Sequence, residues 1–374
     1  MKKYITSESV TEGHPDKVCD KISDKILDSA LQQDKDSKMA VECTIKDNLV
    51  FIYGECNTKA KLNYKKIVKE VIKDIGYDYL PEIIVKVSKQ SKEINTAVTQ
   101  ELTGAGDQGI MFGYATNETK EYMPLPSLLA NKITIELSKL RKKDKKTPLL
   151  PDGKSQVTVE YIADMPKRID TIIISTQHLK TISQEELKDY IITNIINKVI
   201  PKKYIDKKTN ILINPSGSFI LGGPFADSGT TGRKIVVDSY GGSAKVGGGC
   251  YSSKDPTKVD RSAAYYTRYV AKNIVHNKLC DKCEIGVSYA IGIPNPISIN
   301  IETFNTNKVS LEEIYNFINN HFNFSVDNII KELDLKRPIY YQTASYGHFG
   351  RTDIDLPWEK VKEFKNWILF KMAF

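Results

Sequence analysis

The chain has 374 residues, of which 40% are hydrophobic and 27% are charged, with a formal net charge of +8. These fractions match average globular proteins and exclude a disordered or fibrous chain, and the length predicts two or three domains. No apolar run follows Lys2 and Lys3, and no stretch is long enough to cross a bilayer, so the sequence favours a cytosolic protein with no membrane partner.

The pattern of apolar residues predicts three β-hairpins, each followed by a helix. The first helix of the chain begins at Pro15, where proline is tolerated, and precedes these units. The hairpins are expected at 39–55, 156–176 and 284–303, and the helices that follow them at 63–75, 184–199 and 310–321. A further helix is expected from about Asp260 to Val275.

This repetition predicts an α+β fold of three structurally related domains, each a sheet with helices on one face. We expect the N-terminal domain at 1–100, the central domain at 101–225 and the C-terminal domain at 226–374.

The positive charge does not by itself indicate a nucleic-acid partner. The most basic run, KLRKKDKK at 139–146, falls at the end of a predicted helix and is interpreted as a solvated segment. Among the six cysteines only Cys280 and Cys283 form a CxxC pair, without the second pair that a zinc site needs, so reduced structural thiols are expected.

Two short motifs stand where predicted helices begin. GHPDK at 13–17 and KDPTKVDR at 254–261 each combine lysine with aspartate at a helix N-terminus, which attracts anions, and Asp16 and Asp260 are the aspartates of interest. Two carboxylates among lysines suit magnesium held jointly with phosphate oxygens. The alternative for each motif alone is an aspartate that caps a helix beside solvated lysines.

Several glycine-rich segments accompany these motifs. GAGDQG at 104–109 and FILGGPFADSGTTGRK at 219–234 carry acids and bases, GGG at 247–249 precedes KDPTKVDR, and PDGK at 151–154 brings Lys154 before a strand. None fits the Walker A template. Each could be a simple turn, but together they suit a highly charged anion such as a nucleoside triphosphate with its metals. The residues alone do not say which bond breaks.

The same segments carry a family resemblance. ESVTEGHPDK at 8–17, GAGDQGIMFGYA at 104–115, GGP and TGRK within 222–234, KDPTKVDRSAAY at 254–265 and YGHFGR at 346–351 occur in order along nearly the whole chain. In these motifs the chain resembles the S-adenosylmethionine synthetases, also called methionine adenosyltransferases. The resemblance implies three α+β domains with pseudo-threefold symmetry, in agreement with the repeat.

The resemblance also implies a reaction. The sulfur of L-methionine attacks C5′ of ATP and expels triphosphate, which is cleaved to pyrophosphate and phosphate. A thioether has no proton to remove, so no general base is required. The barrier lies in bringing the sulfur into line with C5′ and in stabilising charge on the leaving triphosphate. The implied partners are ATP, L-methionine and a second copy of the chain, since the family builds its site between two subunits; dimer and tetramer both stay open.

Roles for individual residues follow from the resemblance. His14 is implied to contact the triphosphate near the C5′ oxygen, and Lys154 to lie near the reaction centre. Two Mg²⁺ ions per site and one K⁺ are implied, with Asp16 and Asp260 as magnesium ligands and Glu42 as the potassium ligand. The implied catalytic set is His14, Asp107, Lys154, Arg233, Lys254 and Lys258.

The substrate-binding residues are implied in the same way. Phe219 is implied to stack on adenine, and Asp227 and Glu55 to lie at the methionine and ribose end. Lys17 and Lys234 are implied to be polyphosphate cations. The implied binding set is Lys17, Glu55, Thr96, Asp152, Ser218, Phe219, Asp227, Lys234 and Cys250. YGHFGR, with His348, is assigned to structure.

The chain departs from the family pattern around the substrate pockets. Thr96 stands where a methionine-contacting glutamine is usual, and Ser218 where a long basic residue is usual. Further departures are Ala226, Val246 and the CYSS segment that ends at Ser253. They motivate an alternative, a non-catalytic or regulatory paralogue that binds nucleotide without turnover.

Overall fold

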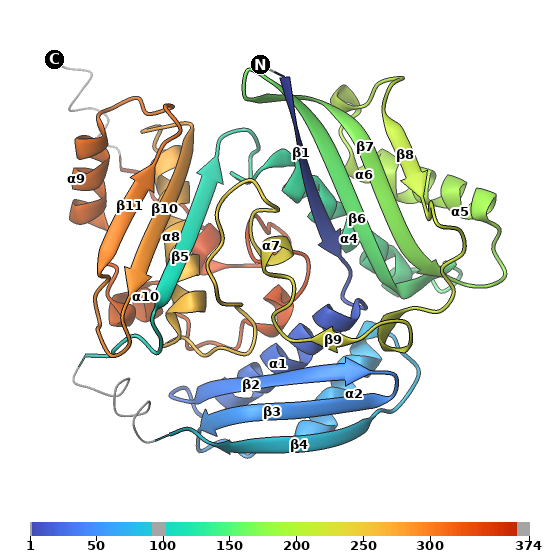
Figure 1. The fold of residues 1–374 in the computed structure, drawn as a ribbon, viewed down its shortest axis with the longest axis horizontal. Coiled ribbons are helices and arrows are strands. Elements are labelled where there is room, and N and C mark those ends of the chain that lie inside the picture. The colour runs from blue at the N-terminus through green and yellow to red at the C-terminus, as the bar shows by residue number, and fades with distance from the viewer. Residues whose placement is uncertain (1, 92–101, 365–374) are drawn as a thin grey trace.

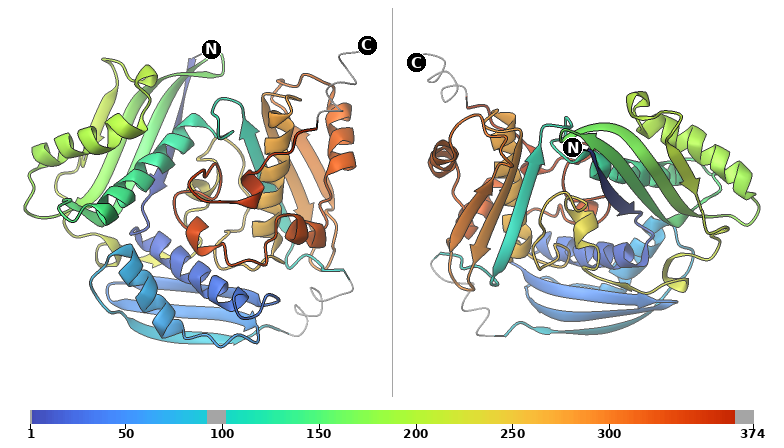
Figure 2. Two further views of the ribbon diagram at one scale, coloured as in Figure 1. Left: turned by 180° about the vertical axis from the view of Figure 1, so that it is seen from behind. Right: turned by 45° about the horizontal axis from the view of Figure 1, so that its top comes forward.

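A computed structural model describes residues 2–91 and 102–364 of the chain. Three β-sheets surround a central region that contains the short helix α7 (Ile235–Asp238) and the extended segments around it (Figure 1). Helices cover one face of each sheet, as the view from behind in Figure 2 shows. The α+β fold of three related units is therefore confirmed.

The first sheet is built on the hairpin expected at 39–55. In spatial order its strands are β4 (Glu82–Lys89), β3 (Leu49–Asn57), β2 (Lys38–Lys46) and β9 (Gly229–Thr230). Residues of β2 alternate between buried and half-buried, as expected for a strand with one face on the core. The helices α1 (Pro15–Leu31) and α2 (Tyr64–Ile75) pack here, and α2 ends at Gly76 in the left-handed conformation.

The central sheet is built on the long hairpin expected at 156–176. Its strands, in order, are β1 (Lys2–Val10), β6 (Leu149–Ile162), β7 (Met165–His178) and β8 (Asn210–Ile213). It is covered by α4 (Leu125–Lys143) and by the predicted helix after the hairpin, which is α5 (Gln184–Ile191), a π-helical turn at Ile192–Ile196 and α6 (Asn197–Val199). The 3₁₀ turn Lys202–Tyr204 follows.

The third sheet contains the hairpin expected at 284–303. Its strands, in order, are β11 (Ser298–Glu302), β10 (Lys282–Tyr289) and β5 (Gly109–Thr116). The helix α8 (Val259–His276) packs against β5 and β10. The remaining elements are α9 (Leu311–His321), α10 (Val326–Glu332) and 3₁₀ turns at Gly223–Phe225, Tyr341–Thr343 and Pro357–Glu359.

Each sheet takes one strand from a neighbouring sequence segment. Strand β1, from the N-terminal segment, pairs with β6; β5, from the central segment, pairs with β10; and β9, from the C-terminal segment, pairs with β2. We propose that 1–100, 101–225 and 226–374 remain the repeating segments of the chain. The exchange of strands ties them together and brings segments distant in sequence toward the centre.

Two hydrophobic cores support this arrangement. One is shared by the first and third sheets with α1, α2 and α8, and the other lies between the central sheet and α4, α5 and the π-helical turn. Helices α1 and α8 are buried on nearly all sides, unlike ordinary surface helices. Their many charged residues must therefore find partners inside the protein.

The segment YGHFGR has the structural role that the sequence analysis assigned to it. His348 is fully buried, its Nδ1 lies 2.7 Å from the Tyr265 hydroxyl, and its carbonyl accepts a hydrogen bond of 2.8 Å from the Trp358 indole. These contacts fix the chain after α10 against α8.

The interpretation of the basic run as entirely solvated is wrong for two residues. Arg141 and Lys142, in the last turn of α4, each lie 2.8 Å from the carboxylate of Glu12, which is buried just before GHPDK. Lys21 also reaches Glu12, at 3.1 Å. A buried carboxylate requires such neutralisation, so part of the run anchors the first motif.

Candidate active site

The GHPDK motif forms the N-terminus of α1, as predicted. His14 is the N-cap, and its Nδ1 accepts a hydrogen bond of 3.2 Å from the backbone N–H of Asp16. Burial, together with the nearby Lys234 ammonium, lowers the pKa of His14 to about 3. The imidazole is therefore neutral at pH 7, and because Nδ1 accepts, the proton is assigned to Nε2.

Asp16 joins GHPDK to the TGRK segment. Its carboxylate accepts a hydrogen bond of 3.0 Å from the Thr230 N–H and lies 2.5 Å from the Lys234 ammonium and 3.7 Å from the Arg233 guanidinium. Burial acts to raise the pKa of Asp16, but the Lys234 and Thr230 hydrogen bonds outweigh it and hold the pKa below its usual value. Asp16 is thus an ionised carboxylate facing two cations.

The PDGK segment and the loop before TGRK lie beside the same histidine. The charges of Lys154 and Asp227 act on both His14 and Asp152. Asp152 is buried, and its Oδ2 accepts a hydrogen bond of 2.8 Å from the Gly223 N–H. Burial raises the pKa of Asp152 to about 6. The structure therefore brings one group of predicted residues together: His14, Asp16, Asp152, Lys154, Asp227, Arg233 and Lys234.

A second group forms where α8 begins. Asp260, in the first turn of α8, lies 2.5 Å from the Lys254 ammonium. Gly249 stands so close that a β-carbon there would overlap the Asp260 carboxylate. Burial raises the pKa of Glu42 on β2, while the charge of Lys254 opposes this and that of Glu55 adds to it. The second group is thus Glu42, Glu55, Lys254 and Asp260.

Cys250 lies between the two groups. Its Sγ is so near Gly232 of TGRK that a β-carbon there would approach it to 2.6 Å, and Lys254 and Glu42 act on it electrostatically. Burial raises the pKa of Cys250 to about 11, so the thiol is neutral. The two helix N-termini therefore border one continuous region lined by glycines, lysines and carboxylates.

Lys17 does not have the position expected for a polyphosphate cation. Its side chain is fully buried, its ammonium lies 2.9 Å from Asp20, and it contacts Asp238 as well. Burial acts to lower the pKa of Lys17, but the two carboxylates together raise it, so the ammonium stays charged. Enclosed in this way, Lys17 stabilises the fold beneath the motif and cannot reach an anion beside His14.

Lys258 and Asp107 lie at the edge of the second group. The Lys258 ammonium is 2.6 Å from Asp255. Asp107 is exposed, with its carboxylate 2.8 Å from the Gln108 N–H, and the adjacent Gly106 donates a hydrogen bond of 3.0 Å to the Thr257 carbonyl. GAGDQG therefore contacts the KDPTKVDR loop.

The expected adenine-binding segment is held by one histidine. The N–H of Phe219 donates to His178 Nε2 at 3.0 Å, and the His178 N–H donates to the Phe219 carbonyl at 3.0 Å. The Phe219 ring is half-buried and Ser218 is exposed. Thr96 lies outside the described residues.

A stripe of aspartates along α1 escaped the sequence analysis. Asp16, Asp20, Asp24 and Asp28 recur every four residues, and all four are buried. Asp24 pairs with Arg261 of α8 through two hydrogen bonds, of 2.7 and 2.8 Å, which lock the two motif helices together. The spacing of four is visible in the sequence and was the available signal.

The donor atoms of the region fit magnesium shared with a ligand. Within residues 2–91 and 102–364, no cluster of three or more His, Cys, Asp or Glu side chains forms a metal cage. Asp16 and Asp260 instead each offer one carboxylate, which lies beside Lys234 and Lys254 respectively. Magnesium commonly binds one or two carboxylates and completes its shell with phosphate oxygens and water, so this donor set fits.

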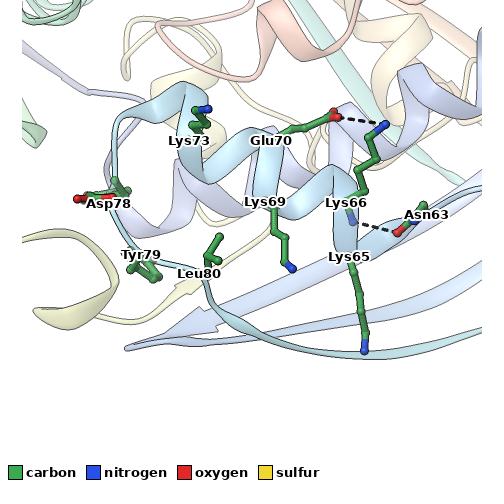
Figure 3. Close-up of a pocket in the computed structure, with 10 residues that line it drawn as sticks. Asn63, Lys65, Lys66, Lys69, Glu70, Lys73, Asp78, Tyr79 and Leu80 are labelled. Atoms are coloured by element: carbon green, nitrogen blue, oxygen red, sulfur yellow. Dashed lines mark hydrogen bonds and ion pairs between the residues drawn. The ribbon is translucent and has the colours of Figure 1, made fainter.

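A separate groove lies on the outer side of α2. It has a volume of about 720 Å³ and contains none of the predicted site residues. Figure 3 shows its lysines, of which Lys66 lies 3.9 Å from Glu70, while Lys65 and Lys69 point outward. Lysines on an exposed helix face are usually solvated, and the groove gives no reason to move the site there.

Known proteins match the chain over almost its entire length. Models of the S-adenosylmethionine synthetase N-terminal, central and C-terminal domains match residues 2–101, 102–219 and 221–360. S-adenosylmethionine synthase of Clostridium tetani (strain Massachusetts / E88) is 48% identical over 391 residues, covering 98% of this chain and 100% of the relative. The synthase of Finegoldia magna (strain ATCC 29328 / DSM 20472 / WAL 2508) is 49% identical over 377 residues, covering 96% of each.

None of the described helices is both long enough and apolar enough to cross a membrane. The three described sheets and the helices α1 and α8 all fall within the residues that the three domain models match. The chain belongs to the S-adenosylmethionine synthetase family.

Proposed function

We propose that this protein synthesises S-adenosylmethionine from ATP and L-methionine, and that it cleaves the displaced triphosphate to pyrophosphate and phosphate. The observation that carries the proposal is the junction of two helix N-termini, where Asp16 faces Arg233 and Lys234 while Asp260 faces Lys254. Such alternation of carboxylates and cations suits a polyphosphate with its metal ions.

The residues would act on the leaving group rather than on the nucleophile. Methionine sulfur needs no base, so the chain has to align it with C5′ and stabilise negative charge as the C5′–O bond breaks. The neutral His14 can donate a hydrogen bond from Nε2 to the departing oxygen. Lys154, Arg233, Lys234 and Lys254 are the cations we assign to the triphosphate.

The proposed metals have identifiable ligands. Asp16 and Asp260 would hold two Mg²⁺ ions together with substrate phosphates, and the bound ions would stabilise charge on the leaving triphosphate. Glu42 would hold K⁺, since this carboxylate is half-buried and its pKa is raised by burial, with Lys254 offsetting only part of that effect. Phe219, Asp227 and Glu55 are proposed to bind the adenosine and methionine end.

We further propose at least a homodimer, with Asp107 and Lys258 completing a site shared between subunits. Exposed apolar side chains occur on the strands of all three sheets, a pattern that favours association. Examples are Ile84 and Val85 on β4, Ile110 on β5 and Leu212 on β8. All six cysteines are free, which fits a reducing compartment, and we place the protein in the cytoplasm.

The test is product formation by the purified full-length protein. With ATP, L-methionine, Mg²⁺ and K⁺ we expect S-adenosylmethionine by mass spectrometry, and none when methionine or Mg²⁺ is omitted. A folded protein that binds ATP yet forms no product under these conditions would contradict the proposal and support the non-catalytic alternative.

A further inference from the structure

Tyr77 lies directly after α2, in a position fixed by the end of that helix. Gly76 adopts a left-handed conformation with φ of 98°, and the N–H groups of Gly76 and Tyr77 donate to the Ile72 carbonyl at 3.2 and 3.1 Å. This C-terminal capping motif directs the following side chain away from the helix. The segment after α2 therefore points toward the first motif rather than continuing along the surface.

The Tyr77 hydroxyl contacts the GHPDK loop. It donates a hydrogen bond of 2.6 Å to the carbonyl of Gly13, the residue before His14. His14 and Asp16 follow within three residues, so this bond fixes the backbone that carries them. Tyr77 is half-buried, and the Gly13 backbone that accepts the bond is buried.

The Tyr77 ring contacts the opposite side of the site. Gly223 has a φ of +64°, and a β-carbon there would overlap the Tyr77 hydroxyl and ring. Gly223 donates to Asp152, and its carbonyl accepts hydrogen bonds of 2.9 and 3.1 Å from the Ala226 and Asp227 N–H groups. One side chain thus touches both the motif that carries His14 and the turn that carries Asp227.

We propose that Tyr77 is a positioning residue for adenosyl transfer, which sets the placement of the GHPDK loop relative to the Gly223–Asp227 turn. This role rests on the proposed function, in which the first segment faces the triphosphate and the second the methionine and ribose end. Transfer needs both segments in register, because the sulfur must lie in line with the breaking C5′–O bond. Hydrolysis of triphosphate needs no alignment of a sulfur with C5′, so a shift between the two segments should affect it less than it affects transfer.

The neighbouring Tyr79 provides a matched control. Its ring packs edge-on against Phe225 at 5.1 Å and lies 5.8 Å from the Tyr77 ring. Its hydroxyl is also buried, yet it has no hydrogen-bond partner within the described part of the chain. Tyr77→Phe and Tyr79→Phe therefore delete the same atom in the same segment, but only the first removes a contact to the site.

The experiment compares two reactions in the full-length protein. For Tyr77→Phe we expect kcat for S-adenosylmethionine formation to fall about three- to ten-fold, as for the loss of one hydrogen bond. Hydrolysis of added triphosphate should change less than about two-fold, and the thermal midpoint should lie no more than about 4 °C below that of Tyr79→Phe, as for the loss of one hydrogen bond. Tyr79→Phe should change neither rate by more than about two-fold.

Three outcomes would overturn the positioning role. They are a Tyr77→Phe variant with transfer within two-fold of wild type, an equal fall in both reactions, and an equal loss of transfer in Tyr79→Phe. If the wild-type protein is active and any of these results is found, only the role of Tyr77 is contradicted. A wild-type protein that forms no S-adenosylmethionine contradicts the proposed function and this inference with it.

Discussion

A Lys17→Met variant is expected to lose most of its stability rather than its affinity for ATP. The substitution would leave Asp20 and Asp238 buried without their shared cation, at 0% and 2% exposure. Removing one partner of a buried ion pair typically costs about 3–5 kcal/mol. We expect a fall in the thermal midpoint on the order of 10 °C, or loss of soluble protein, measured by scanning calorimetry.

Lys25→Met is the control for this experiment. Lys25 lies two turns further along α1, is only half-buried, and contacts the Tyr341 ring at 5.3 Å. The same change of charge at Lys25 should lower the free energy of unfolding by less than about 1 kcal/mol. If Lys17→Met instead kept the wild-type midpoint and only weakened ATP binding, Lys17 would be a polyphosphate ligand, and our interpretation of its position would be wrong.

Gly249→Ala is expected to damage the site without unfolding the protein. A β-carbon at Gly249 would overlap the Asp260 carboxylate and push it away from the Lys254 ammonium, 2.5 Å distant. Neither Gly249 nor Gly248 has a positive φ, so alanine is compatible with the backbone at both. Displacing a catalytic or metal-binding group by about 1 Å can cost on the order of 100-fold in rate.

Gly248→Ala is the matched control, because a β-carbon at Gly248 would meet no atom within 4 Å. Steady-state kinetics with ATP as the varied substrate should show kcat/KM reduced by about 100-fold in Gly249→Ala and by less than about two-fold in Gly248→Ala. Extra Mg²⁺ should partly restore the first variant. Equal kinetics in the two variants would show that Asp260 is not essential where the structure places it.

The periodic elements were predictable because local pattern determines them. The three hairpins follow from apolar alternation, and α1, α2, α8 and α9 follow from apolar spacing, with Pro15 marking the start of α1. Strand β1 was not predicted. Its residues Lys2–Val10 have no strong apolar alternation, and it is a strand because it pairs with β6 from a distant segment.

The helix expected at 184–199 was predicted in position but not in detail. A π-helical turn at Ile192–Ile196 interrupts it, which apolar spacing cannot reveal. The exchange of β1, β5 and β9 between segments was also invisible, since strand partners are chosen by tertiary packing.

The candidate site was predictable in its residue types but not in its partners. GHPDK, TGRK and KDPTKVDR indicated helix N-termini with carboxylates and cations, and the structure places these segments side by side. Sequence reasoning could not separate Lys234, which faces Asp16, from Lys17, which is enclosed between carboxylates. That distinction depends on burial, and nothing in the five letters of GHPDK encodes it.

The most direct test of the central claim follows one oxygen atom. ATP labelled with ¹⁸O at the atom that bridges C5′ and the α-phosphorus is incubated with methionine and Mg²⁺. Attack at C5′ predicts S-adenosylmethionine formed in amounts equal to pyrophosphate and phosphate, with all the label in these inorganic products. Labelled ADP or AMP released regardless of methionine, with no S-adenosylmethionine, would mean attack at phosphorus and would contradict the proposed function.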